Sequence, residues 1–306
     1  MFLSNINMPN NLSEHDFVIT GSSGYIGSHL LKALHCSKKQ SFVLSREGLI
    51  TLEFVDENKV IRWKHNKTLS DAIFRIRNPI VINLAGHFLA NHKLEDIDRL
   101  VDGNFKFTLK VLDLFRDTNA IFINIGSLWE FNDFGDNKPR NLYSCLKSLN
   151  SQLFEWYAEK YRISGINLKL NDTYGGIDNR NKLLPYFKHC FKKGVDAIIK
   201  SPNQEMNLTH IDDVIRAVFQ ACSYAKSSCP GQVKSFCVLS SETKTILDIA
   251  KLIGQQTNGE FSYITEPNEQ EPGPHKINWD AFQILPNWKS SVPLVRGLKC
   301  YFEGSE

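Results

Sequence analysis

The sequence predicts an α/β protein built on a doubly wound parallel sheet, with a smaller lobe formed by the C-terminal part of the chain. Three observations predict this fold class. Short β-branched runs alternate with longer amphipathic stretches over the first 170 residues, as in repeated strand–helix–strand units. Apolar runs such as VINLA and AIFINI do not alternate with polar residues, so helices should cover their strands on both faces. Beyond about residue 171, prolines divide the chain into shorter elements.

The predicted strands are Phe17–Thr20, Phe42–Leu44, Ile80–Leu84, Ile121–Ile125 and Ile166–Leu170, with helical patterns between them. We divide the chain into a polar lead-in of residues 1–14, a sheet domain of residues 15–170 and a second lobe of residues 171–306. The run VKSFCVLS and the helical pattern TILDIAKLIGQQ predict one more strand–helix unit, so about 208–256 should return to the main sheet.

The charge balance argues against some classes of partner. Lys and Arg total 36 against 33 Asp and Glu, and no basic block marks a surface for a polyanion, so nucleic acid is not expected as the main partner. No stretch approaches the roughly 20 apolar residues of a membrane span, and the first residues lack the pattern of a signal peptide. We expect a cytoplasmic protein that acts on small ligands and has no membrane partner.

The cysteines indicate neither disulfides nor a metal centre. There are seven, an odd number, and they are scattered and never at CxxC spacing. We expect reduced thiols and no metal site.

The segment FVITGSSGYIG indicates a dinucleotide site in a Rossmann-like domain. Its glycines stand between the first strand and the next helix, where they permit a tight turn and let backbone N–H groups approach a pyrophosphate. A glycine-rich turn with only a structural role is the alternative. The residues expected to contact the cofactor here are Gly21, Ser23, Gly24, Tyr25, Ile26 and Gly27.

The end of the second strand favours NADP(H) over NAD(H). A site for NAD(H) usually places an acid there to accept bonds from the adenine ribose, but this chain has Ser45 and Arg46. A hydroxyl and a guanidinium can hold a 2′-phosphate by charge-assisted hydrogen bonds. The alternative is that Arg46 is only a solvated loop charge.

Tyr143 and Lys147 are the strongest candidates for catalysis. They are four residues apart in a predicted helix, so their side chains share one face. A neighbouring ammonium favours the phenolate and should bring the pKa of Tyr143 down from about 10 towards the working pH. Ser127 follows the strand AIFINI, at the edge where parallel sheets expose catalytic groups. The alternative is that Tyr143 only packs.

These motifs together resemble the extended short-chain dehydrogenases/reductases, the group of nucleotide-sugar epimerases, dehydratases and reductases, over nearly the whole chain. Ser127, Tyr143 and Lys147 match the catalytic positions of the family. Three segments are similar to its TGxxGxxG, NxAG and NxxGT motifs, the last with Phe107 in place of glycine: Thr20–Gly27, Asn83–Gly86 and Asn104–Thr108. Three later segments resemble its VYG, IPxF and HVDDV elements: Thr173–Gly175, Leu184–Phe187 and His210–Val214.

The resemblance implies further contacts. The cofactor would also meet Leu84, Ala85, Gly86 and Asn104, and Lys147 would hold the nicotinamide ribose. A nucleotide-sugar substrate would lie between the carboxyl edge of the sheet and the second lobe, where we expect contacts from Leu128, Trp129, Asp172 and Lys182. A helix pair commonly joins two copies in this fold, so we expect a homodimer.

The chain also departs from the family pattern. In the 4,6-dehydratases Asp-Glu follows the catalytic Thr, whereas Leu128 and Trp129 follow Ser127 here. Trp129 also stands where the combined 3,5-epimerase/4-reductase enzymes carry a Cys. Met206 replaces an arginine that grips a diphosphate in many relatives, a charge that Lys182 could supply instead.

These departures favour an NADPH-dependent reductase of a nucleotide-linked 4-keto deoxy sugar, with Tyr143 as the proton donor. The pattern resembles bacterial synthases of CDP-linked 3,6-dideoxyhexoses such as abequose and paratose, which implies a role in making surface polysaccharide such as the O-antigen of lipopolysaccharide. Two alternatives remain. One is an NAD-dependent 4-epimerase, which needs the same three residues. The other is a catalytically silent dinucleotide sensor or scaffold.

Overall fold

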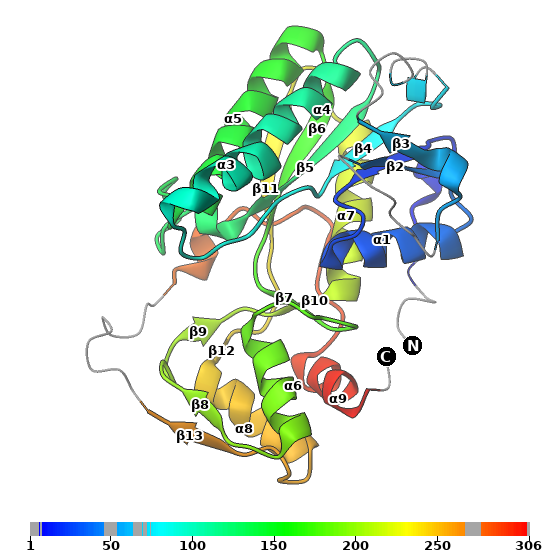
Figure 1. Ribbon diagram of the computed structural model, residues 1–306. Helices are drawn as coiled ribbons and strands as arrows, with labels where there is room; N and C mark the ends of the chain where they lie inside the picture. Colours follow the sequence, from blue (N-terminus) through cyan, green and yellow to red (C-terminus); the bar gives the residue numbers. More distant parts are fainter. Residues whose placement is uncertain are drawn as a thin grey trace.

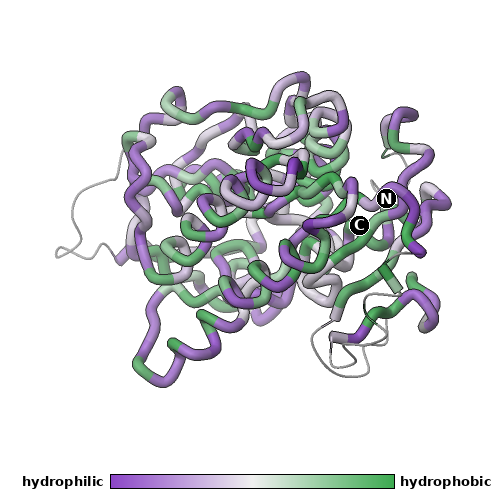
Figure 2. The backbone as a smooth tube through the Cα atoms, turned by 90° about the horizontal axis from the view of Figure 1, so that it is seen from above, coloured by the Kyte–Doolittle hydropathy of each residue, from purple (hydrophilic) through white to green (hydrophobic). Residues whose placement is uncertain are grey.

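The chain forms a large sheet domain and a smaller lobe, which lie one above the other in Figure 1. The computed structural model describes residue 6 and residues 8–45, 54–63, 69, 72–73, 75–266 and 277–304. Arg46 lies outside the described residues. In Figure 2 the apolar stretches gather towards the interior, while hydrophilic residues mark the outer turns. Among the described residues, no helix has the length and apolar character needed to cross a membrane.

The large domain is built on one sheet, with seven strands in the described residues and the order β11-β6-β5-β4-β1-β2-β3. All neighbouring strands are parallel. The strands are β1 (Phe17–Thr20), β2 (Ser41–Ser45), β3 (Val60–Arg62), β4 (Ile80–Asn83), β5 (Ile121–Ser127), β6 (Ser164–Leu170) and β11 (Val233–Val238). The chain winds outward in both directions from β1, so the predicted doubly wound parallel sheet is confirmed.

Helices cover both faces of this sheet (Figure 1). One face packs against α1 (Tyr25–Cys36) and α7 (Ile211–Lys226), and the other against α4 (Phe107–Phe115) and α5 (Leu142–Tyr161). Alternate strand residues therefore enter different cores: Ile19 lies in the first core and Val18 in the second. Before α4 the chain forms α3 (Ile97–Val101) and a π-helical turn, η5 (Asp102–Lys106).

A row of buried polar side chains crosses the sheet in register. Thr20 on β1 donates to Asn83 on β4 at 2.8 Å, and Asn83 donates to Asn124 on β5 at 3.1 Å. Asn124 in turn donates to Asn167 on β6 at 2.9 Å. A slip of one residue would turn these side chains to the other face, so the row fixes the register. Because Thr20 Oγ1 also accepts from the backbone N–H of Ala85 at 3.1 Å, the row ties the end of β4 to that of β1.

The smaller lobe is assembled from separate parts of the chain. Its core lies among α6 (Leu183–Lys193), α8 (Ile246–Gln256) and α9 (Leu294–Glu303). Its short strands are β8 (Ala197–Ile199), β9 (Glu205–Met206), β12 (Lys244–Thr245) and β13 (Tyr263–Thr265). A two-stranded sheet of β7 (Thr173–Tyr174) and β10 (Thr209–His210) lies between the lobe and the large domain (Figure 1). The 3₁₀ helices are η2 (Asn10–Leu12), η3 (Glu57–Lys59), η4 (Leu94–Asp96), η6 (Leu128–Glu130) and η7 (Trp279–Ala281).

One feature differs from the sequence expectations. Within the segment 208–256, β11 pairs with the main sheet and α7 packs against its face. The helix α8 instead packs in the smaller lobe, where Ile249 and Ile253 lie in the same core as Leu298. In the polar lead-in, Leu12 is fully buried in the core against α7, and Asn11 Nδ2 donates to Ser223 Oγ at 2.9 Å.

Candidate active site

The glycine-rich turn after β1 has the shape that an anion-binding loop needs. Gly21 has φ +66°, and a Cβ there would lie 2.8 Å from the backbone nitrogen of Ala85. A Cβ on Gly27 would lie 2.3 Å from the carbonyl oxygen of Gly21, so glycine permits this close approach of helix and turn. No side chain caps the N-terminus of α1 at Gly24. The first N–H groups of the helix therefore remain able to bind a phosphate group.

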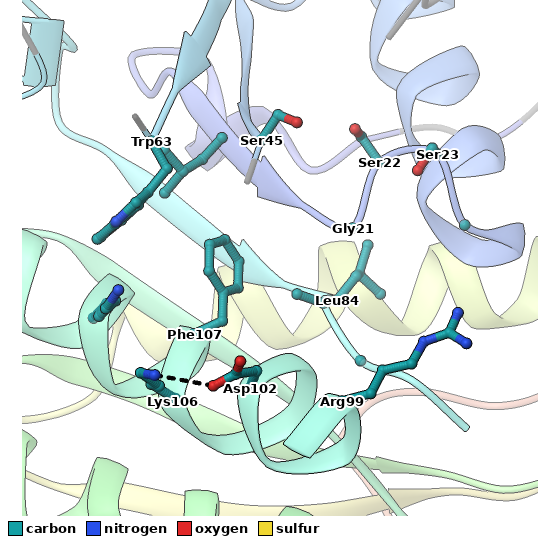
Figure 3. A pocket seen from close by; sticks show the side chains of 15 residues that line it. Gly21, Ser22, Ser23, Ser45, Trp63, Leu84, Arg99, Asp102, Lys106 and Phe107 are labelled. Carbon is teal, nitrogen blue, oxygen red and sulfur yellow. Dashed lines mark ion pairs between the residues drawn. The ribbon is translucent and has the colours of Figure 1, made fainter. Parts of the chain in front are cut away.

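Beside this turn lies a pocket of about 710 Å³, large enough for much of a dinucleotide (Figure 3). The residues predicted to bind cofactor that line it are Gly21, Ser23, Gly24, Ser45, Leu84, Ala85 and Gly86. The other described residues predicted to bind cofactor do not line this pocket. Tyr25 donates its hydroxyl to the carbonyl of Gly175 at 2.6 Å, and Ile26 packs on the core. These features fit a nicotinamide dinucleotide.

Asn104 shapes the pocket without lining it. It lies in the π-helical turn η5 and is fully buried. Its side chain accepts from the backbone N–H of His87 at 3.0 Å and donates to the carbonyl of the same residue at 2.9 Å. Asn104 therefore holds the segment that follows β4, so its role here is to position backbone.

The far wall of the pocket contains residues that the sequence analysis missed. The rings of Trp63 and Phe107 meet edge to face with centroids 5.7 Å apart, and Lys110 Nζ lies 5.6 Å from the centroid of Trp63. Lys106, also in the lining, pairs with Asp102 at 3.1 Å. Trp63 follows β3, a three-residue strand too short to predict, so its place could not be predicted either.

Lys147 reaches from α5 to the carboxyl ends of β4 and β5. Its ammonium donates to the carbonyl of Ala85 at 3.2 Å and to that of Ile125 at 3.0 Å. The side chain is only 3% exposed, and burial lowers the pKa of Lys147 to about 8. Near neutral pH the ammonium is therefore charged but close to losing its proton.

Tyr143 lies one turn earlier on the same helix. Asn141 caps this end of α5 by accepting from the backbone N–H of Ser144 at 2.9 Å. Burial, reinforced by the charge of Glu130, raises the pKa of Tyr143 above its ordinary value. We expected a lower pKa from the neighbouring ammonium, and that expectation was wrong for the protein alone because burial disfavours the phenolate. A neutral phenol is the form that donates a proton.

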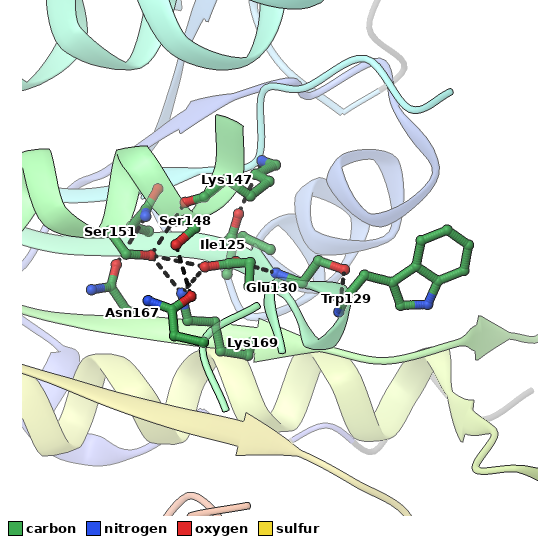
Figure 4. Close-up of polar contacts among 11 residues, drawn as sticks. Ile125, Trp129, Glu130, Lys147, Ser148, Ser151, Asn167 and Lys169 are labelled. Atoms are coloured by element: carbon green, nitrogen blue, oxygen red, sulfur yellow. Dashed lines mark hydrogen bonds and ion pairs between the residues drawn. The ribbon is translucent and has the colours of Figure 1, made fainter. Parts of the chain in front are cut away.

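Ser127 ends β5 and begins the 3₁₀ turn η6. Its Oγ accepts from the backbone N–H of Trp129 at 3.2 Å, which leaves the hydroxyl proton available to a ligand. Glu130, at the end of the same turn, accepts from the backbone N–H of Ser127 at 2.7 Å. Figure 4 shows Glu130 beside Lys169, a buried pair that the sequence analysis missed.

An aromatic wall stands next to Tyr143. The ring of Phe88 meets that of Tyr143 edge to face, with centroids 5.1 Å apart, and that of Trp129 at 5.6 Å. Phe88 was missed, because nothing in the sequence shows that the segment after β4 meets the turn after β5. Leu128, predicted to contact substrate, is only 2% exposed and packs against Cys237 and Phe282, since η6 turns it into the core.

The two residues predicted to contact substrate from the second part of the chain lie at this wall. Lys182 Nζ is 4.1 Å from the ring centroid of Phe88 and 5.3 Å from that of Trp129. The same ammonium is 3.7 Å from Asp172 Oδ1. Lys182, Asp172 and Trp129 are therefore brought together, although they come from different segments.

The sheet, the glycine turn and the tyrosine–lysine helix define a dinucleotide-binding α/β protein. The chain belongs to the NAD dependent epimerase/dehydratase family, whose model matches residues 17–233. Two curated relatives are CDP-abequose synthases. The one from Yersinia pseudotuberculosis is 31% identical over 217 residues, covering 70% of this chain and 74% of the relative. The one from Salmonella typhimurium is 27% identical over 209 residues, which cover 65% of this chain and 67% of the relative.

Solved structures share the fold over nearly the whole chain. UDP-glucuronic acid 4-epimerase from Bacillus cereus, in complex with UDP-glucuronic acid and NAD, has a TM-score of 0.77 at 20% identity and covers 94% of this chain and 98% of its own. UDP-N-acetylglucosamine 4-epimerase from Methanobrevibacter ruminantium has a TM-score of 0.76 at 15% identity and covers 96% of this chain and 99% of its own.

Proposed function

We propose that the protein is an NADPH-dependent reductase that converts a nucleotide-linked 4-keto deoxy sugar into the 4-hydroxy sugar. The observation that carries this proposal is the turn after Ser127. Leu128 is buried, Trp129 is aromatic, and the carboxylate of Glu130 is bound to a backbone N–H and to Lys169. No side chain of this turn is free to act as an acid or base on the sugar, so elimination of water is disfavoured. The similarity to two CDP-abequose synthases supports the same conclusion.

The chain's own residues supply what carbonyl reduction needs. A nicotinamide dinucleotide bound in the pocket would supply the hydride. Tyr143 holds the proton for the carbonyl oxygen, and its raised pKa keeps that proton in place until the oxygen becomes basic. Ser127 can donate its hydroxyl to the same oxygen, because its Oγ acts as an acceptor towards the turn that follows it, from the backbone N–H of Trp129 among others. Lys147 places a positive charge at the carboxyl edge of the sheet.

The aromatic wall favours a sugar that lacks hydroxyl groups. Phe88 offers no polar atom, and the ring face of Trp129 cannot pair with a hydroxyl pressed against it. Burying an unpaired hydroxyl costs roughly 1–3 kcal/mol, so a deoxy sugar should bind better than a hydroxylated one. Lys182 adds a cation at the edge of this wall, suited to the phosphates of a nucleotide.

The proposed preference for NADPH is supported from the adenosine end of the pocket. Ser45 lines it where an acid would repel a 2′-phosphate, and Lys110 adds positive charge, whereas the charge of Lys106 is offset by Asp102. We expect NADPH to bind more tightly than NADH by about one to two orders of magnitude, measured by calorimetric titration. Ser45→Asp should reduce or reverse the preference; equal affinities in the unaltered protein would contradict it.

Two further features belong to the proposal. The exposed side chains of Trp156 and Leu149 on α5 give that helix an apolar surface suited to a second copy of the chain. We therefore keep the expected homodimer, which sedimentation equilibrium would test. Synthesis of cell-surface polysaccharide sugars in the cytoplasm is the expected setting.

The central experiment supplies a 4-keto deoxyhexose and a fully hydroxylated hexose, each linked to CDP, UDP or dTDP, in separate reactions. With the keto sugar, we expect one NADPH consumed per 4-hydroxy sugar formed, followed by absorbance and by NMR of the product. Loss of water from the hydroxylated hexose would indicate a dehydratase. Interconversion of two sugars without net cofactor consumption would indicate a 4-epimerase, the activity that the names of the two solved neighbours describe.

A further inference from the structure

A buried ion pair lies directly behind the proposed catalytic residues. The carboxylate of Glu130 and the ammonium of Lys169 are in contact, and their side chains are 2% and 3% exposed. Lys169 lies near the end of β6 and Glu130 in the turn after β5. Such a pair is a poor source of stability, because burying both charges costs about as much as their attraction returns. Its position at the active edge of the sheet therefore requires another explanation.

Glu130 is connected to each proposed catalytic element. One carboxylate oxygen accepts from the backbone N–H of Ser127 at 2.7 Å. The other accepts from Ser151 Oγ at 3.2 Å, and Ser151 lies one turn after Lys147 on α5. Ser151 Oγ also contacts Lys169 Nζ, and the carbonyl oxygen of Lys147, 3.3 Å away, can share the one proton of this hydroxyl. Figure 4 shows these side chains converging between α5 and the sheet.

The chain leaves room for this pair by having no side chain at Gly126. A Cβ there would lie 2.4 Å from Glu130 Oε1 and 2.7 Å from Lys169 Cδ. Gly126 leaves space for the ion pair, and the next residue, Ser127, is the one whose backbone N–H binds Glu130.

We propose that Glu130 and Lys169 are positioning residues for the reaction. Glu130 holds Ser127 and the catalytic face of α5 in place. Lys169 neutralises the negative charge of Glu130, so that Lys147 carries the one uncompensated charge among these described residues. The inference rests on the proposed roles of Ser127, Tyr143 and Lys147. The negative charge of Glu130 raises the pKa of both Tyr143 and Lys147, and the positive charge of Lys169 lowers that of Lys147.

The test uses charge removal in both partners. Glu130→Gln keeps an oxygen that can accept from Ser127 but leaves Lys169 without a counter-charge. The proton affinities of Tyr143 and Lys147 should then fall, so the alkaline limb of kcat/KM for the 4-keto sugar should move to lower pH by about one unit. Lys169→Met should not move the limb to lower pH. In the double variant the cluster is neutral again, so the limb should return to its original position.

A second measurement does not depend on turnover. The dissociation constant of NADPH, followed by fluorescence from pH 6 to pH 10, should show the same shift in Glu130→Gln and the same return in the double variant, because Lys147 is expected to hold the ribose. If no 4-keto sugar is turned over, this titration still tests the pair. Circular dichroism checks that each variant folds.

Glu155→Gln is the matched control, since Glu155 is exposed on the same helix. Removing the charge of Glu155 should change neither the pH profile of kcat/KM nor that of the NADPH dissociation constant, because solvent screens an exposed charge. An unshifted limb in Glu130→Gln, or a double variant that stays as shifted as the single one, would show that the pair only fills space and would overturn the proposal.

Discussion

At the level of single residues, Tyr143 offers the most direct test of the proposed chemistry. Phenylalanine fills nearly the same space, so Tyr143→Phe should keep the fold and the affinity for NADPH. Turnover of the keto sugar should fall by about 10²–10⁴, the usual contribution of a general acid. Loss of NADPH absorbance measures it. Tyr224→Phe on α7 is the control and should leave turnover unchanged; comparable turnover in the two variants would exclude Tyr143 as the donor.

Lys147 should make the stability of the fold depend on pH. Burial lowers its pKa to about 8, whereas a lysine in the unfolded chain titrates near 10.4. Between these values the unfolded state holds more protons, so the free energy of unfolding should rise with pH, by up to about 1.4 kcal/mol per unit. Below pH 8 both states are charged, and the cost of burying the ammonium is fully present.

Urea unfolding of the protein and of Lys147→Met between pH 7 and pH 10.5 measures this slope. The variant should be more stable at pH 7, and the difference should shrink as pH rises. A constant difference across this range would mean that Lys147 keeps an ordinary pKa in the fold.

The sequence could predict some residues of the site and not others. Ser127, Tyr143 and Lys147 were identified because the end of a strand and one face of a helix are local properties of the chain. Phe88, Glu130 and Lys169 were not, because their role depends on partners far along the chain: 41 positions separate Phe88 from Trp129, and 39 separate Glu130 from Lys169. Local spacing carries no information about such contacts.

At the level of elements, β5 should be unusually sensitive to one methyl group. In Gly126→Ala the new Cβ would lie 2.4 Å from Glu130 Oε1, and the buried pair leaves little room to move. We expect the free energy of unfolding to fall by about 1–3 kcal/mol, as in other overpacked cores. Chemical denaturation measures it.

Gly254→Ala is the matched control within α8. A Cβ there meets only the carbonyl oxygen of Phe261, at 3.7 Å. Alanine is the better helix former, so this variant should gain about 0.5–1 kcal/mol. Two changes of the same sign would contradict the assignment of strain to Gly126.

The elements could be predicted from the sequence where their pattern was long and continuous. Six strands of the main sheet were expected within two residues of their bounds. β3 was missed, because three residues are too few for a periodic signal. The placement of α8 was wrong because its apolar face is the same whichever core it enters, and in the structure that face packs in the core with α6 and α9.

At the level of the whole molecule, Arg180 connects the segment after β7 to the start of α1 through a cation–π contact and to β7 through a hydrogen bond. Its guanidinium lies 3.7 Å from the ring centroid of Tyr25 and donates to the carbonyl of Thr173 at 2.7 Å. Arg180→Ala should lower the free energy of unfolding by about 1–2 kcal/mol, because a stacked, partly buried cation is lost. Thermal unfolding measures it.

The control is Arg116→Ala on the surface, where the ion pairs with Asp113 and Asp117 are exposed. Its effect should stay below about 1 kcal/mol. Equal effects of the two substitutions would mean that Arg180 does not fasten the two parts together.

The way the smaller lobe is assembled limits how this protein can acquire a new substrate. In the described residues, α6, α8 and α9 lie in one core, yet β10, α7 and β11 of the chain intervene before α8 and belong outside it. No single stretch of the gene therefore encodes the lobe. A recombination event could not exchange it as a cassette, so new specificity would have to arise by point changes in place, most economically at the few aromatic and charged residues of the proposed sugar site.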